Sequence, residues 1–322
     1  MKNLILFLLL FSIIEIFAQK PELHFTFEGI GDNREFHNGK SKSQTIFGTL
    51  GFLEAGTSFD GHSLRAGISE LYEFGSQLNF HHPRLILYYK FENEKNTFIM
   101  GSFPRRNAIN FPLSMLADTL LVYRPLLEGL LGSKKWENGW QNAFVDWTGR
   151  QTETVRESFM AGSSGEVSRK QWFLQNYVLL NHLAHTSVRI PDQHIKDYFG
   201  FSILTGFRSP KTSQVSWYVK GGILGSLYRE RSVSDGFTFR KSLELEATAQ
   251  YRQFSLKTAF HTGDSQIFAL GDPFYSFRNY NRTDLGWSFI RHKRVSGHFN
   301  WSFHTYAGGL DQSQQMSLIY SL

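Results

Sequence analysis

The chain has 322 residues, no cysteine and a formal net charge of +6, and 16% of its residues are aromatic. The lack of cysteine excludes disulfides, thiolate metal sites and cysteine nucleophiles, and with them a small disulfide-rich secreted module. Lysine and arginine are interspersed with acidic residues and form no basic stripe, so we expect no nucleic-acid partner. Such a surface suits anionic lipid headgroups or a lumen that favours anions.

The first 18 residues predict a cleavable export signal. Lys2 supplies a positive start, residues 4–14 an apolar stretch, and Ala18 a small residue before Gln19. The apolar stretch is too short for a transmembrane helix, which needs about 20 residues. We therefore expect residues 19–322 to form the mature chain, as one large β domain.

Apolar and polar residues alternate directly after this signal. In residues 84–92 the odd positions are apolar, while the polar residues of the segment fall on even positions. Successive side chains of a strand point to opposite faces, so one face of this segment avoids water. Strands are predicted in this part of the chain over residues 22–30, 45–53, 63–74, 84–92 and 97–103.

Residues 105–135 interrupt the alternation. Pro104, Pro112 and Pro125 break it, and residues 113–121 favour a short helix. We expect residues 105–135 to be inserted into a barrel or to cap it.

Alternation then returns and continues to the end of the chain. It is clearest in residues 242–252, where Glu244 and Glu246 alternate with leucines along the strand. It is equally clear in residues 298–306, where aromatic residues alternate with His298, Asn300, Ser302 and His304. We predict roughly 14 strands, and allow 12 to 16 because bacterial barrels use even numbers. The later predicted strands cover residues 141–150, 153–160, 169–184, 197–208, 213–227, 236–252, 254–261, 283–291, 295–306 and 314–322.

The last segment carries a resemblance to a known class. Met316, Leu318, Tyr320 and Leu322 alternate with polar residues, as in the C-terminal strand that the barrel-assembly machinery binds, although Leu322 stands where an aromatic residue is usual. The chain resembles a porin-like outer-membrane β-barrel protein of a diderm (Gram-negative) bacterium. This resemblance implies an all-β, single antiparallel transmembrane barrel in the outer membrane, with membrane lipid and the assembly machinery as partners. It identifies no subfamily and no substrate.

A soluble β-sandwich would show the same alternation, since antiparallel sheets often bury one face. The many aromatic residues near predicted strand ends, such as Trp147, Trp287 and Trp301, favour the membrane, because barrels carry aromatic girdles at both interfaces.

Charged residues provide the candidates for a pore constriction. The first group is Arg105, Arg106, Arg124, Asp146, Arg150 and Arg156, which lie on or near the middle segment. The second is Glu244, Glu246 and Arg252 on one predicted strand face, with Lys220 and Arg208 on neighbouring strands. If these residues converge they set solute selectivity or, by pairing, close the lumen; otherwise they are surface charges.

His298, Asn300, Ser302 and His304 resemble in residue type the sites of outer-membrane lipid hydrolases. Alternate residues of one strand lie about 6.6 Å apart, which is beyond hydrogen-bond reach, so catalysis would need partners from another strand. We considered His261, Asp264 and Ser265 as such partners and expect polar, lumen-facing residues instead.

The leading hypothesis is therefore a channel for passive diffusion of small hydrophilic or anionic solutes. The alternatives are a closed barrel with a structural or adhesive role and a lipid-modifying hydrolase. No motif indicates a metal or an organic cofactor, and no enzyme activity is predicted.

Overall fold

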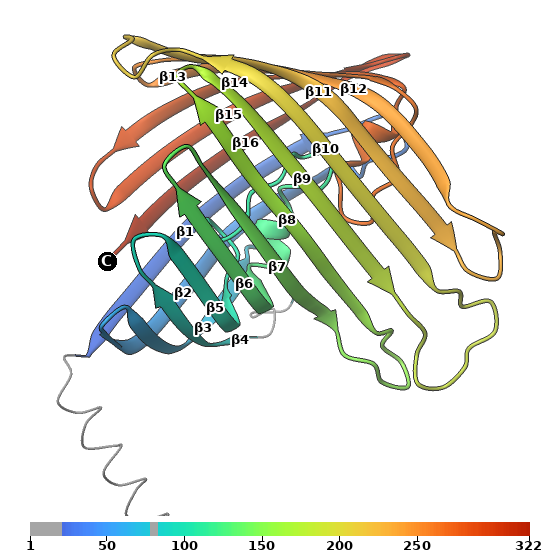
Figure 1. The fold of residues 1–322 in the computed structure, drawn as a ribbon, viewed down its shortest axis with the longest axis horizontal. Helices are drawn as coiled ribbons and strands as arrows, with labels where there is room; N and C mark the ends of the chain where they lie inside the picture. Colours follow the sequence, from blue (N-terminus) through green and yellow to red (C-terminus); the bar gives the residue numbers. More distant parts are fainter. Residues whose placement is uncertain (1–20, 78–82) are drawn as a thin grey trace, which may run out of the picture.

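The computed structural model of the protein describes residues 21–77 and 83–322. Their strands form one closed antiparallel barrel of 16 members (Figure 1). The export signal predicted over residues 1–18 lies outside the described residues. The strands are β1 (Glu22–Glu35), β2 (Gln44–Phe59), β3 (His62–Glu73), β4 (Arg84–Glu92), β5 (Asn96–Pro104), β6 (Leu126–Trp136), β7 (Gly139–Gly149), β8 (Ser158–Arg169), β9 (Trp172–Leu183), β10 (Lys196–Arg208), β11 (Val215–Glu230), β12 (Thr238–Tyr251), β13 (Phe254–Gly263), β14 (Asn279–Arg291), β15 (Val295–Tyr306) and β16 (Gly309–Ser321).

Closure comes from the first and last strands. β1 pairs with β16 in a register that runs from Thr26 opposite Ser321 to Glu35 opposite Gln312. Each strand also pairs with its neighbours in the chain, so the sheet has no free edge.

The expected fold class, an antiparallel β-barrel, is confirmed, but the expected number of about 14 strands is too low. The main strand that the prediction left out is β6, which occupies residues that we assigned to the inserted segment. Its first two residues, Leu126 and Leu127, are both buried, so the sequence there does not alternate. The inserted segment accordingly ends at Pro125 and not at Lys135.

The two faces of the wall are those that the alternation predicts. In β4, Leu85 is 65% exposed while the next residue, Ile86, is fully buried. In β12, Leu243 and Leu245 are exposed and Glu244 is buried between them. The outer wall is therefore apolar and suited to lipid, while polar side chains point inward.

The two ends of the barrel differ in their connections. Turns of two residues (60–61, 137–138, 170–171 and 252–253) join strands at one end, where β1 also begins and β16 finishes. We call this the short-turn end. The opposite, long-loop end carries the two longest connections, residues 105–125 between β5 and β6 and residues 264–278 between β13 and β14.

These two connections fold into the lumen (Figure 1). The first contains helix α2 (Leu120–Tyr123) and the second the 3-10 helix η1 (Pro273–Ser276). Backbone bonds join them, from Ala117 N to Leu270 O at 2.8 Å and from Asp272 N to Leu113 O at 2.9 Å. Their apolar side chains pack against inward-facing residues of the wall and form a lumenal core, whose members include Phe111, Met115, Leu120, Leu131, Phe144, Leu204, Leu224 and Phe274.

The lumen therefore holds an apolar core where a wide pore would hold water.

Among residues 21–77 and 83–322, no helix is long and apolar enough to cross a membrane.

Candidate functional site

Four of the predicted constriction residues fasten the inserted segment to the wall. Arg105 and Asp146 form an ion pair in which the side chains are only 3% and 2% exposed. Arg105 also donates to the carbonyls of Arg124, at 2.8 Å, and Leu126, at 2.9 Å. Arg106 donates to both carboxylate oxygens of Glu28 at 2.7 Å. Arg105 and Arg106 are thus paired with carboxylates of the wall, and Arg124 takes part through its backbone carbonyl, so these contacts hold the root of the segment in place.

Three other candidates do not join this group. Arg150 is exposed in the β7–β8 connection. Arg156 donates to the carbonyls of Leu183, Ala184 and His194, and so ties this connection to the one between β9 and β10. Arg252 lies in the β12–β13 turn at the short-turn end, with a φ of 51°, and does not share the inward face of Glu244.

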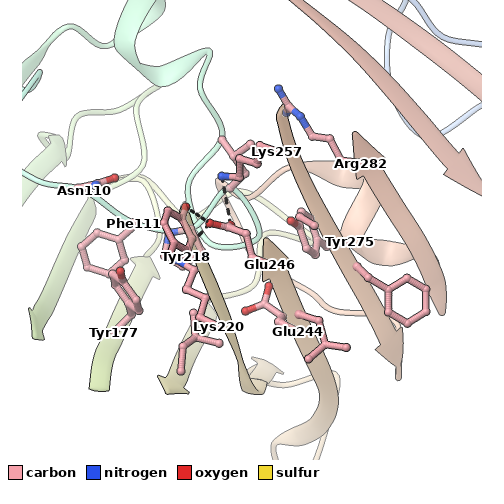
Figure 2. A pocket seen from close by; sticks show the side chains of 16 residues that line it. Asn110, Phe111, Tyr177, Tyr218, Lys220, Glu244, Glu246, Lys257, Tyr275 and Arg282 are labelled. Atoms are coloured by element: carbon pink, nitrogen blue, oxygen red, sulfur yellow. Dashed lines mark hydrogen bonds and ion pairs between the residues drawn. The ribbon is translucent and has the colours of Figure 1, made fainter. Parts of the chain in front are cut away.

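Glu244 and Glu246 line a cavity of about 330 Å³ inside the barrel, which we call the Glu246 cavity (Figure 2). The Glu246 carboxylate lies 3.3 Å from Lys220 Nζ and 3.1 Å from Lys257 Nζ, and it accepts a hydrogen bond from the Tyr218 hydroxyl. The expected pairing with Lys220 is thus present. Arg208 instead pairs with Glu166 at 2.6 Å.

A second cavity, of about 310 Å³, lies beneath the β1–β2 connection at the long-loop end, and we call it the His304 cavity. Strand β15 contributes His304 and β16 contributes Ser313, while Arg34 comes from β1 and Arg282 from β14. Two inserted segments contribute carboxylates: residues 105–125 supply Asp118 and residues 264–278 supply Asp272. The β1–β2 connection adds Lys40 and Lys42 at the rim.

His304 is held on both ring nitrogens. Its Nδ1 lies 2.7 Å from the Tyr280 hydroxyl, and its Nε2 lies 3.4 Å from the Ser313 hydroxyl. The ring stacks on Phe274, with a centroid distance of 4.3 Å, and the edge of Phe36 packs against it at 5.2 Å. The inserted segment that carries η1 therefore fixes the orientation of the imidazole.

Sequence reasoning identified His304 but not its partners. Ser302, its expected companion, accepts hydrogen bonds from Arg282 Nη2 at 3.1 Å and Asn300 Nδ2 at 2.8 Å. Asp264 accepts from the backbone of Lys241, so it is occupied elsewhere. The partners come from adjacent strands, as the argument from strand geometry requires, but only the strand register reveals Tyr280 and Ser313.

The charges around this cavity are largely balanced. Arg34 pairs with Asp32 at 2.6 Å and with Asp118 at 3.0 Å, and Arg282 pairs with Asp284 at 2.7 Å. Burial alone would raise the pKa of Asp118, but the nearby Arg34 and Arg282 outweigh it and hold this pKa at about 2. Asp118 is therefore an anion at neutral pH.

Asp272 behaves in the opposite way. Burial raises the pKa of its carboxyl to about 6, and the more distant Arg282, at 3.9 Å, offsets only part of that rise.

This arrangement has the parts of a nucleophilic site. If the ring proton of His304 sits on Nδ1, the Tyr280 oxygen accepts it, and the lone pair of Nε2 then faces the Ser313 hydroxyl. A serine beside a histidine that a third group orients is the usual way to activate a hydroxyl, and the contact is often loose before substrate binds. The guanidinium groups of Arg34 and Arg282 line the same cavity and favour developing negative charge.

Comparison with known proteins shows the family and the fold. Residues 17–319 match the lipid A 3'-O-deacylase-type family. Among solved structures, the chain is similar to OmpT of Vibrio cholerae with loop L8 deleted, at 7% identity and a TM-score of 0.59 over 95% of this chain and 100% of that one. It is also similar to OprD of Pseudomonas aeruginosa, at 9% identity and a TM-score of 0.57 over 94% and 95% of the two chains.

A third similar structure is an anion-selective porin from Comamonas acidovorans, at 10% identity and a TM-score of 0.57 over 94% of this chain and 100% of that one. No curated protein matches the chain. The likeness to the porins concerns the barrel fold alone, whereas the family match spans nearly every residue, and so the chain belongs to the lipid A 3'-O-deacylase-type family.

Proposed function

We propose that the protein is an outer-membrane hydrolase that removes an O-linked acyl chain from lipid A or a similar phosphorylated glycolipid. The observation that carries this proposal is the contact of His304 Nε2 with the Ser313 hydroxyl inside a cavity that also holds two guanidinium groups. Membership of the lipid A 3'-O-deacylase-type family supports the substrate class.

The chemistry follows from this contact. His304 Nε2 takes the hydroxyl proton of Ser313 while the Ser313 oxygen attacks the ester carbonyl and forms a tetrahedral adduct. The bond from the acyl carbon to the sugar oxygen then breaks, and His304 returns the proton to that oxygen. Water attacks the acyl-serine in the same way, which releases the fatty acid and restores the hydroxyl.

The position of the cavity suits an outer-leaflet lipid. In outer-membrane barrels the longer loops face the outside, and the His304 cavity lies at the long-loop end. Lys40 and Lys42 are exposed at its rim, where ammonium groups would attract the phosphates of lipid A. Export and an outer-membrane location are part of this proposal.

The test is acyl release from lipid A by the refolded mature chain in vesicles, followed by mass spectrometry. We expect wild-type protein to remove one acyl chain. His304→Gln should slow the reaction by about 10²- to 10⁴-fold, the range for loss of a general base, and Ser313→Ala should slow it at least as much because it removes the nucleophile. Ser164→Ala is the matched control, because Ser164 is a buried, inward-facing serine that bonds to Asn142 in another part of the wall.

All variants should keep the heat-dependent gel mobility of a folded barrel. Full activity in Ser313→Ala, or no acyl release by a correctly folded wild-type protein, would overturn the assignment.

Passive diffusion of small anionic solutes is the second candidate. It is favoured by Lys220, Lys257 and Arg282, which line the Glu246 cavity, and by the likeness of the fold to an anion-selective porin. It predicts discrete conductance steps in planar bilayers and a preference for anions in a salt gradient, reduced in Lys220→Gln. A folded barrel without conductance or acyl release would leave a closed structural or adhesive barrel.

A further inference from the structure

Strands β6 and β7 separate at the long-loop end of the barrel. Their pairing begins only at Gly129 opposite Asp146, so the first three residues of β6 have no β7 partner. The Asp146 carboxylate fills part of the gap, since it accepts a bond from Glu128 N at 3.0 Å. What remains is a cavity of about 170 Å³.

Three arginines line this cavity, which we call the arginine notch. They come from three segments: Arg84 from β4, Arg105 from the start of the inserted segment and Arg124 from its last turn. Glu128, Asp146, Trp147 and Thr148 complete the lining, with Leu126 behind them. The notch shares no residue with the His304 cavity.

The guanidinium groups in the notch have unused hydrogen-bonding capacity. Arg105 is 3% exposed, and its Nη1 has no hydrogen-bond partner in the described part of the chain. Arg124 makes one long bond, from Nη2 to Thr148 O at 3.3 Å. Arg84 donates to the carbonyl of Tyr123 at 3.0 Å. A buried donor without a partner raises the free energy of the folded protein. An acceptor that enters the notch would bond to this donor and remove that cost.

Positive charge is also in excess. Asp146 neutralises Arg105, but Glu128 is exposed at the mouth, and Arg84 and Arg124 donate only to carbonyls. Burial lowers the pKa of the Arg124 guanidinium, and neighbouring Arg105 and Arg84 lower it further, although Asp146 acts in the other direction. An anion placed among these groups would relieve their mutual repulsion.

The notch is flanked by a residue of the lipid-facing wall. Trp147 is 46% exposed and stacks on Phe159 at a centroid distance of 5.5 Å, and Phe159 lies 5.2 Å from the His182 ring. These rings stand near the long-loop ends of β7, β8 and β9. Aromatic residues at strand ends mark the level of the lipid headgroups, so the notch lies at that level.

We propose that the arginine notch binds the phosphate group of an outer-leaflet lipid headgroup, docked against the wall between β6 and β7. Guanidinium groups match the oxygens of a phosphate with charge-assisted hydrogen bonds, and several arginines can share one phosphate. This site is separate from the proposed hydrolase site, and its occupation does not depend on catalysis.

The test counts the lipids retained by the refolded mature chain in native mass spectrometry. Phosphatidic acid and diacylglycerol with the same acyl chains are the probes, because they differ only in the phosphate. We expect phosphatidic acid to be retained and diacylglycerol not. Arg124→Gln should weaken retention by about ten- to a hundredfold, the effect of losing a charged hydrogen-bond donor. The backbone carbonyl of residue 124, which accepts a hydrogen bond from Arg105, is unchanged in this variant.

Two further variants sharpen the result. Arg150→Gln removes an exposed charge at the same end outside the notch and should bind as the wild type does. Glu128→Gln removes the acidic group at the mouth and should tighten binding. Equal retention of phosphatidic acid by wild type and Arg124→Gln would overturn the proposal. Competition by millimolar inorganic phosphate with no preference for the lipid would also overturn it, in favour of a free-phosphate site.

Discussion

The ion pair between Arg105 and Asp146 at the root of the inserted segment can be tested by Asp146→Asn. Asparagine keeps an oxygen for Glu128 N, which now bonds to Asp146 at 3.0 Å, but it removes the negative charge. Arg105 would retain its bonds to the carbonyls of Arg124 and Leu126, at 2.8 and 2.9 Å. Its charge would lose its counter-ion in a site where the side chain is only 3% exposed.

Breaking a buried ion pair by removing one partner costs about 3–5 kcal/mol, because an uncompensated charge stays behind. At about 1.4 kcal/mol per factor of ten, the folding equilibrium should fall by roughly 10²- to 4 × 10³-fold. The assay is urea unfolding of the barrel in lipid vesicles, followed by the fluorescence of its 7 tryptophans.

The control is the double variant Arg105→Met with Asp146→Leu, which removes both charges and keeps apolar volume in the gap. Such replacements are often neutral or stabilising, although this one also removes the side-chain partners of the Arg124 and Leu126 carbonyls and of Glu128 N. The double variant should therefore unfold at a higher urea concentration than Asp146→Asn, because it leaves no unpaired charge. If Asp146→Asn alone unfolds within about 1 kcal/mol of the wild type, the range of an exposed pair, then the pair is hydrated and our reasoning about the root of the segment is wrong.

Three further predictions concern the inserted segments. Burial raises the pKa of Asp272 from 3.8 to about 6, so folded protein holds this proton more tightly than unfolded protein, and stability falls as the pH rises from about 4 to 6. Asp272→Asn should abolish this fall, worth about 3 kcal/mol, when urea midpoints at pH 4 and pH 8 are compared. Replacement of residues 106–124 by Asn-Gly should keep the barrel closed, because Arg105 N already bonds to Pro125 O at 2.7 Å. It should raise the single-channel conductance several-fold, because it removes much of the lumenal core. Unchanged conductance would mean that other residues close the lumen. Met115→Ala should lower the free energy of unfolding by about 2–5 kcal/mol, since Met115 is fully buried, and a loss under 1 kcal/mol would contradict tight packing of the lumenal core.

The contents of the lumen separate this barrel from an open channel. The inserted segments carry Phe111, Met115 and Phe274 into the lumen, and Phe274 stacks directly on His304. The same packing that fills the lumen thus orients the histidine of the proposed hydrolase site. A variant that opens the lumen should therefore also reduce acyl release, provided that it removes the support of this ring.

The sequence by itself determined the two faces of the wall and every strand but β6. In β4 the exposed Leu85 and Leu87 flank the buried Ile86, and in β16 Met316 and Leu318 face outward as expected. These features follow from the period of two in a strand, which is a property of the local backbone and needs no knowledge of distant residues. His304 was identified as lumen-facing for the same reason.

Only the tertiary structure decided the number of strands and the partners at the sites. Strand β6 escaped prediction because Leu126 and Leu127 are both buried. Leu126 packs in an apolar cluster with Leu50 and Ile86, and Leu127 packs in the lumenal core. His304 meets Tyr280 and Ser313 because β14, β15 and β16 pair in one particular register. The arginine notch likewise joins residues from three segments that are distant along the chain. Strand register and the docking of an inserted segment depend on contacts between distant residues, and a periodic pattern in one segment carries no information about them.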